Sequence, residues 1–89
     1  MSALTRPAWA SSTIAPDMPG DFGLHQATVT VGNVTIGVDQ VIDLECSSPE
    51  PLFANLRNIN VDADVDAQQC RDLAAALLKA ATIIEAATV

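Results

Sequence analysis

A continuous helical pattern from Asp66 to Ala87 constrains this sequence more than any other feature. No Gly or Pro interrupts it, and good helix formers dominate its interior. Asp66 is suited to cap the first turn, and Gln69 can complete a capping box. The pattern therefore predicts a C-terminal helix roughly 30 Å long. Apolar residues recur on one face of this helix, at Cys70, Leu73, Ala74, Leu77, Ala80, Ala81, Ile84 and Ala87.

The apolar arc of the predicted helix is too wide for one small sheet to cover. On a helical wheel, Leu73, Leu77 and Ile84 lie at the centre of the arc, and Leu78 and Ile83 lie on its two borders. The border residues are either half-buried at the edge of the core or in contact with a second chain, since leftover apolar surface on a small domain marks an interface. Leu78 and Ile83 are therefore candidate interaction residues.

The first 20 residues carry three prolines and a glycine and have no sustained period. We expect residues 1–20 to form a flexible arm, extended or disordered. Residues 21–89 are expected to form a single small domain, because a chain of 89 residues supports one modest core. Trp9 is the only aromatic residue of the arm and its expected anchor, either on the chain's own sheet or on a partner.

In the middle of the chain, apolar residues alternate with polar ones, as is typical of half-buried strands. Two β-branched runs separated by Gly32-Asn33 predict a β-hairpin. The alternation continues to Cys46 with Gln40 as its single violation. The second strand is therefore either long and bent near Gly37, or divided by a bulge near Gln40.

A third strand is predicted over residues 58–66, where Asn and Asp alternate with Ile, Val and Ala and lead directly into the helix. Residues 52–56 are ambiguous. The predicted fold is thus α+β in the order β-β-β-α, a three-stranded antiparallel sheet with one face packed on the C-terminal helix. Three strands and a helix can be stable where an isolated hairpin is marginal.

The charge balance limits the classes of partner. The chain carries 11 acidic and 4 basic residues, for a net charge of −7. Direct nucleic-acid binding and docking on anionic lipid both need clustered Lys and Arg, so we expect neither. The sequence has no bilayer-spanning stretch and no apolar signal region, which predicts a cytoplasmic protein. Cys46 and Cys70 are accordingly expected to be reduced, buried small hydrophobes.

The row of Asp62, Asp64 and Asp66 suggests a calcium site by residue type alone. An EF-hand loop that starts at Asp62 needs Gly at its sixth position and Glu at its twelfth, where Ala67 and Leu73 stand. The calcium loop is therefore rejected. A solvated strand face that discourages edge-to-edge pairing is the favoured interpretation of the three carboxylates.

The remaining residue types that could carry chemistry do not combine. His25, Cys46 and Cys70 match no zinc spacing, and no fourth ligand is apparent. No nucleophile with a nearby base and no Gly-rich phosphate loop is visible. We therefore expect no enzymatic activity, no metal and no cofactor.

The run from Val65 to Ala81 resembles the ending of small actinobacterial and actinophage proteins of unknown function. Those proteins end in Leu-Thr-x-x-Gln-Ala-Arg-x-Leu-Ala-x-x-Leu-x-x-Ala-Ala after a β-rich front half, with Asp66 here in place of the Thr and Cys70 in place of the Ala. Some also begin with a Pro-x-Trp-Cys segment. This chain has Pro7 and Trp9 at the corresponding positions but Ala10 in place of the Cys. The resemblance implies an actinobacterial or phage setting and no particular activity.

These observations favour a small accessory module that binds protein, either a second copy of itself in a homodimer or a host protein. Trp9, Leu78 and Ile83 are the predicted contacts. Two alternatives stay open. One is an acidic nucleic-acid mimic that inhibits a DNA- or RNA-binding protein through a negative surface of Asp39, Asp43, Glu45, Asp62, Asp64 and Asp66. The other is a virion or other structural component.

Overall fold

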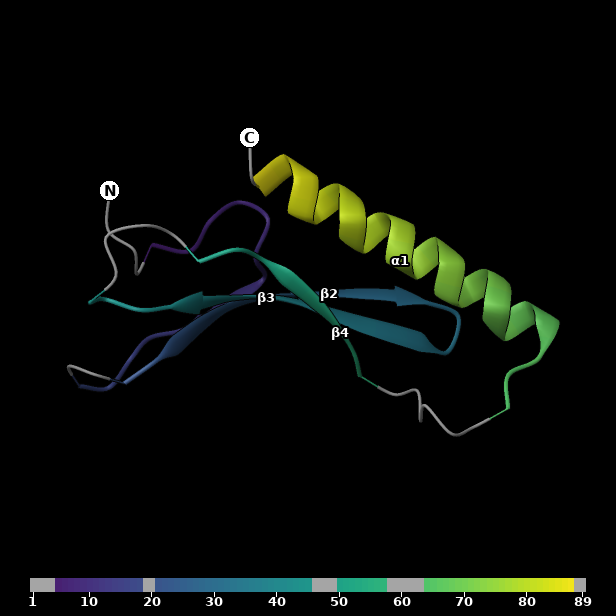
Figure 1. Cartoon of the computed structure of the whole chain (residues 1–89), viewed down its shortest axis with the longest axis horizontal. Coiled ribbons are helices and arrows are strands. Elements are labelled where there is room, and N and C mark those ends of the chain that lie inside the picture. Colours follow the sequence, from purple (N-terminus) through teal and green to yellow (C-terminus); the bar gives the residue numbers. More distant parts are fainter. Residues whose placement is uncertain (1–4, 19–20, 46–49, 58–63, 88–89) are drawn as a thin grey trace.

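The structure, a computed structural model, describes residues 5–18, 21–45, 50–57 and 64–87. Within these residues, one antiparallel sheet has the strand order β1-β2-β3-β4 and is followed by a single helix (Figure 1). The predicted α+β class is confirmed, but the sheet has four strands where three were expected. The elements are β1 (Ser12–Ile14), β2 (Gly23–Val31), β3 (Val34–Ile42), β4 (Phe53–Leu56) and α1 (Ala67–Ala87).

The helix α1 begins where its capping residues predict. The backbone N–H of Gln69 donates to Oδ1 of Asp66 at 2.8 Å, and the backbone N–H of Asp66 donates to Oε1 of Gln69 at 3.0 Å. These two reciprocal bonds form a capping box and satisfy donors that the first turn leaves without helical partners. The predicted N-terminus of the helix is therefore confirmed, with Asp66 as the N-cap and Ala67 as the first helical residue.

The strands β2 and β3 form the predicted hairpin around Gly32-Asn33. Gly32 has a φ of 58°, and no described non-glycine residue has a positive φ. A two-residue turn with positive φ only at its first position is a type II′ turn, which suits the right-handed twist of the strands. A side chain at Gly32 would also meet the carboxylate of Asp72 on α1. The turn therefore needs glycine both for its backbone and for the approach of the helix.

Gln40 does not divide β3. The pairing with β2 runs one to one from Val34 to Ile42, so the proposed bulge is wrong and the long strand is correct. Gln40 lies opposite His25 and donates its side-chain amide to the backbone oxygen of Glu50 at 2.8 Å. This bond satisfies the side chain without a break in the ladder. The strand ends at Ile42, earlier than the alternation predicted.

The two additional strands lie at the edges of the sheet. β1 falls inside the segment predicted to be an arm, and β4 falls inside the ambiguous stretch 52–56. Each has at most four residues and is fixed by pairing with the long hairpin, which a local pattern does not reveal. Of the predicted third strand, residues 58–63 lie outside the described residues, and residues 64–66 precede the helix without strand structure.

The helix α1 covers one face of the sheet, and the core lies between them (Figure 1). Ala76 and Ala80 are the buried residues of α1, so the centre of its buried face differs from the prediction. Leu77, expected at that centre, is exposed. The small alanines face the sheet because they allow a close approach to the bulky strand residues. The buried cluster comprises Ala27, Val29, Val34, Ile36, Val38, Leu52, Ala76 and Ala80.

Among the residues that the structure describes, no helix is both long enough and apolar enough to cross a bilayer.

Candidate interaction surface

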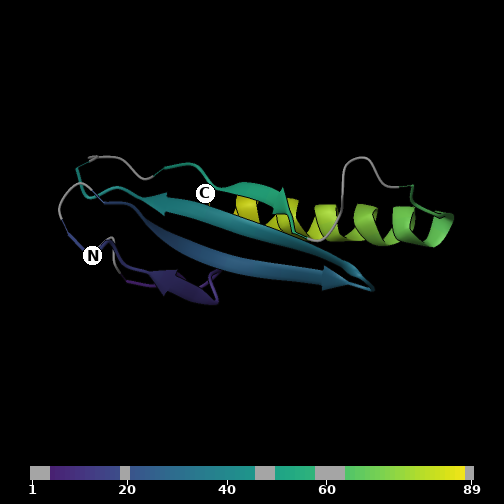
Figure 2. The same ribbon diagram turned by 90° about the horizontal axis from the view of Figure 1, so that it is seen from below.

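The face of the sheet opposite α1 has no described element packed on it, and we call it the uncovered face (Figure 2). Its residues follow from the register, because residues paired across antiparallel strands point to the same side and alternate residues point to opposite sides. Ile14 pairs with Leu24, and Leu24 pairs with Val41. These three residues form an apolar row across β1, β2 and β3 on the uncovered face.

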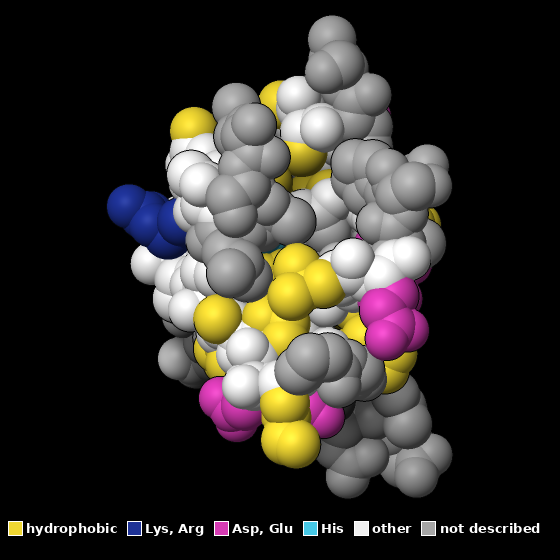
Figure 3. Space-filling model, turned by 90° about the vertical axis from the view of Figure 1, so that its left-hand side faces the viewer, with side chains coloured by type: hydrophobic (Ala, Val, Ile, Leu, Met, Phe, Trp, Pro, Cys, Tyr) yellow, Lys and Arg dark blue, Asp and Glu magenta, His cyan; other side chains and the backbone are white. Residues whose placement is uncertain are grey.

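Both phenylalanines of the chain lie near this row. Phe53 pairs with Asp39, which places it on the uncovered face, and its side chain is 45% exposed. Phe22 directly precedes β2 and is 67% exposed, while Ile14 is 55% exposed. Figure 3 views the molecule from the end where β2 begins and β3 ends, and hydrophobic side chains gather in the middle of that end. From the register and the exposed fractions, we define the apolar patch as Ile14, Phe22, Leu24, Val41 and Phe53.

Asp39 is the buried charge at the centre of the uncovered face, with only 5% of its surface exposed. The terminal nitrogen Nη2 of Arg57 lies 3.3 Å from both carboxylate oxygens, and the side-chain amide of Asn55 also donates to Asp39. A side chain at Gly37 would meet the guanidinium of Arg57. Gly37 therefore leaves the space through which Arg57 reaches Asp39.

This pairing makes the strands nearly free of net charge. Asp39 is the only one of the 11 acidic residues that lies within the four strands, and no Lys or Arg lies within them. Arg57 neutralises it from the position after β4. The prediction that Asp39 contributes to an exposed acidic surface is therefore wrong, because the carboxylate is buried and paired.

The three residues predicted to contact a partner occupy different environments. Leu78 is 71% exposed on the outer side of α1. Trp9 and Ile83 are partly buried and pack against the buried cluster of this chain. The ring of Trp9 meets His25 edge to face, with ring centroids 6.4 Å apart, and Nδ1 of His25 lies 2.7 Å from the hydroxyl oxygen of Thr13. The structure does not bring Leu78, Ile83 and Trp9 together as one exposed surface.

The predicted acidic surface is only partly described. Asp62 lies outside the described residues, and Asp64 is exposed. Asp66 is exposed, but its carboxylate is engaged at the start of α1. The three carboxylates therefore do not form one described cluster.

Cys70 is exposed on α1, so the prediction that it is buried is wrong. The buried face of α1 is centred on Ala76 and Ala80, which leaves Cys70 outside it although the helical pattern had included Cys70 in the apolar face. Cys46, with its predicted burial, lies outside the described residues. Within the described ranges, no group of three His, Cys, Asp or Glu side chains could hold a metal ion.

Sequence reasoning missed the uncovered face because it assigned β1 and β4 no strand. Leu24 and Val41 carried a signal, since each is apolar at a position whose alternation points away from the core. Ile14, Phe53 and Arg57 carried none, because only the register of the edge strands places them beside Leu24, Val41 and Asp39.

Comparison with known proteins identifies no relative of this chain. No family model, curated protein or solved structure matches the chain. The functional interpretation below therefore depends on the surface itself.

Proposed function

We propose that this chain is a small, non-enzymatic protein-binding module that self-associates through the uncovered face of its sheet. The observation that carries the proposal is the apolar patch, in which Ile14, Phe22 and Phe53 are each 45% exposed or more. Exposed aromatic and aliphatic side chains grouped on one face of a small domain are typical of a binding surface. In the proposed dimer, two uncovered faces pack about 10 Å apart as in a β-sandwich.

The charge distribution favours a second copy as the occupant. Two chains with a net charge of −7 each repel one another wherever their carboxylates meet. The uncovered face avoids this repulsion, because its one strand carboxylate, Asp39, is paired with Arg57. The strands of two such faces can therefore approach without an unpaired carboxylate between them, while Asp and Glu side chains lie around the hydrophobic side chains at that end of the molecule (Figure 3). The apolar patches supply the attraction.

The setting that we propose is the cytoplasm of an actinobacterium or its phage, on the basis of the resemblance of the run from Val65 to Ala81. A role as an accessory factor is compatible with a domain that contributes a surface and no catalytic group. The acidic-mimic alternative has lost one of its carboxylates, since Asp39 is buried beside Arg57.

The decisive experiment compares two exposed apolar residues on opposite sides of the molecule. Phe53→Ser removes a side chain from the apolar patch, and Leu78→Ser removes one from the outer side of α1. Leu78 is the more exposed of the two, so exposure alone predicts a larger effect there. We expect sedimentation equilibrium to show a wild-type dimer, a dimer that is at least about tenfold weaker for Phe53→Ser, and an unchanged dimer for Leu78→Ser.

Circular dichroism and thermal unfolding serve as the control that both variants are folded. A wild-type chain that stays monomeric at every concentration would overturn self-association. Loss of the dimer in Leu78→Ser with retention in Phe53→Ser would move the interface to the outer side of α1.

A further inference from the structure

The outer edge of β2 is only partly occupied. The strand β1 pairs with β2 from Leu24 to Gln26 and no further. The remaining residues of β2, from Ala27 to Val31, have β3 on one side and no described strand on the other. A strand edge of this kind presents backbone donors and acceptors that can pair with another chain.

The hydrogen bonds already present show which backbone groups point outward. Ser11 donates its backbone N–H to the carbonyl oxygen of Gln26 at 2.8 Å, so Gln26 faces the outer edge. In an antiparallel ladder, alternate residues direct both backbone groups to the same side. Thr28 and Thr30 therefore direct their N–H and C=O groups outward, past the end of β1.

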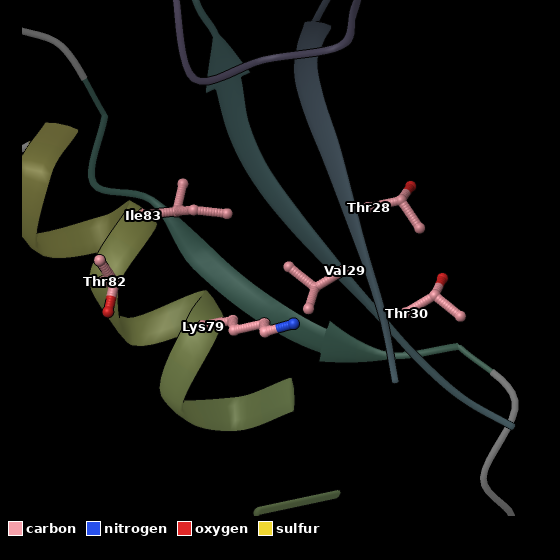
Figure 4. Close-up of a pocket in the computed structure, with 6 residues that line it drawn as sticks. All are labelled: Thr28, Val29, Thr30, Lys79, Thr82 and Ile83. Atoms are coloured by element: carbon pink, nitrogen blue, oxygen red, sulfur yellow. The ribbon is translucent and has the colours of Figure 1, made fainter. Parts of the chain in front are cut away.

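A groove of about 400 Å³ adjoins this free edge on the side of α1 (Figure 4). Val29 and Ile83 face one another across it, and Lys79 extends from α1 toward β2. On the side of α1 its lining thus combines the apolar side chains of Val29 and Ile83 with a single charged group, the cation of Lys79, whereas the side chains of Thr28 and Thr30 point away from α1. The lining residues are Thr28, Val29, Thr30, Lys79, Thr82 and Ile83.

From this juxtaposition we propose that the edge of β2 is a strand-addition site for an extended peptide that carries a carboxylate. The peptide pairs with the outward backbone groups of Thr28 and Thr30 and continues the sheet beyond the end of β1. Its alternate side chains then point toward α1, where an apolar side chain contacts Val29 and Ile83. A Glu or Asp two residues away on the same side of the peptide lies within reach of Lys79.

Charge complementarity selects an acidic peptide over a second copy of this chain. Lys79 is the only charged residue of the groove, in a chain with 11 acidic and 4 basic residues. A peptide carboxylate gains a partner there. A second copy paired through its own β2 edge instead brings another Lys79 to the same side of the joined sheet, and gives the first Lys79 no carboxylate partner there.

The test uses a displayed library of eight-residue random peptides, selected for binding to the Phe53→Ser variant so that self-association does not interfere. Thr28→Pro removes one outward N–H at a position where an edge strand tolerates proline. Thr28→Ala is the matched control, because it keeps that N–H. We expect selected peptides to alternate apolar residues with at least one Asp or Glu, to bind Thr28→Ala, and to lose at least about tenfold in affinity for Thr28→Pro.

The carboxylate is tested with synthetic Glu and Gln versions of one selected peptide. We expect the Glu version to bind about two- to fivefold more tightly, and this preference to vanish in Lys79→Gln but not in Arg71→Gln. Hydrogen exchange supplies a second readout: the amides of Thr28 and Thr30 should exchange rapidly in the free protein and slowly with peptide bound.

Three results would overturn the proposal. In the first, the library yields no binder. In the second, the selected peptides bind Thr28→Pro as well as they bind Thr28→Ala. In the third, the Thr28 and Thr30 amides of the free Phe53→Ser variant become protected as protein concentration rises, which would assign the edge to a second copy. The first two results do not bear on the apolar patch, which sedimentation of the wild-type chain tests separately. The third would reveal a self-association that Phe53→Ser does not remove, so it is distinguished from the proposed dimer by its indifference to that substitution.

Discussion

The two faces of this sheet differ in how far their apolar side chains are covered. The covered face presents aliphatic residues, such as Ile36 and Val38, to a helix whose fully buried residues are alanines. The uncovered face presents an apolar row at one end and a paired Asp39 and Arg57 at its centre. The first face is complete within one chain. The second remains partly exposed, and the difference indicates where this molecule binds a partner.

The largest expected effect is a loss of stability on truncation of a residue buried in the covered face. Ile36→Ala should lower the free energy of unfolding by about 2–5 kcal/mol, because Ile36 is fully buried between the sheet and α1. Ile14→Ala on the uncovered face is the matched control, and its effect on the monomer should stay within about 0.5 kcal/mol. Urea unfolding of both variants, under conditions that keep the chain monomeric, measures the contrast. Equal losses would remove the distinction between the faces.

The next effect concerns the charged centre of the uncovered face. Arg57→Ala leaves the buried carboxylate of Asp39 with Asn55 as its remaining side-chain partner, and should cost about 1–3 kcal/mol. Asp39→Asn should cost less, because the guanidinium of Arg57 is partly exposed and can turn to water. The two variants should also differ in association: Arg57→Ala places an unpaired charge on the interface and should weaken the dimer more. The reverse order in both measurements would contradict this account of the pair.

A smaller effect is expected at the start of the helix that covers the sheet. Asp66→Ala removes the oxygen that accepts the backbone N–H of Gln69, and should destabilise the fold by about 0.5–2 kcal/mol. Asp64→Ala is the control, because Asp64 lies outside the capping box. Hydrogen exchange should show earlier opening of the first turn of α1, with no change in the dimer constant. A large change in that constant would link the helix cap to the uncovered face.

The smallest effect is expected for Leu78→Ser, which should change the free energy of unfolding by no more than about 0.5 kcal/mol. Leu78 is 71% exposed and is not part of the buried cluster. Thermal unfolding measures this directly. A loss well above that size would mean that Leu78 packs against something in solution, and would restore the outer side of α1 as a contact surface.

The parts of the fold that the sequence predicts are those governed by local pattern. The hairpin and α1 each carry their own period and their own terminal signals, Gly32-Asn33 for the turn and the Asp66 capping box for the helix. The edge strands depend instead on pairing with the hairpin. Because β1 has three residues and β4 has four, neither is long enough to show a period.

The site was predicted less well than the fold for the same reason. Helical periodicity placed Leu78 on a border of the apolar arc, where the structure exposes it, but it placed Leu77 at the centre of the core and left out Ala76. Side-chain size misled the prediction, since the residues nearest the sheet are the small ones. The burial of Asp39 could not be foreseen, because its partner Arg57 is 18 residues away and reaches it only through the register of β4.

The order of the elements along the chain has a consequence for synthesis. The sheet is complete at Leu56, and the helix that covers it ends at Ala87. At 5–20 residues per second, the ribosome needs about 2–6 s to add the 31 residues from one point to the other. A hairpin that forms before α1 has packed on it has both faces and its β2 edge open to other chains. We therefore expect chaperones that bind β-branched segments to bind the hairpin before α1 packs on it.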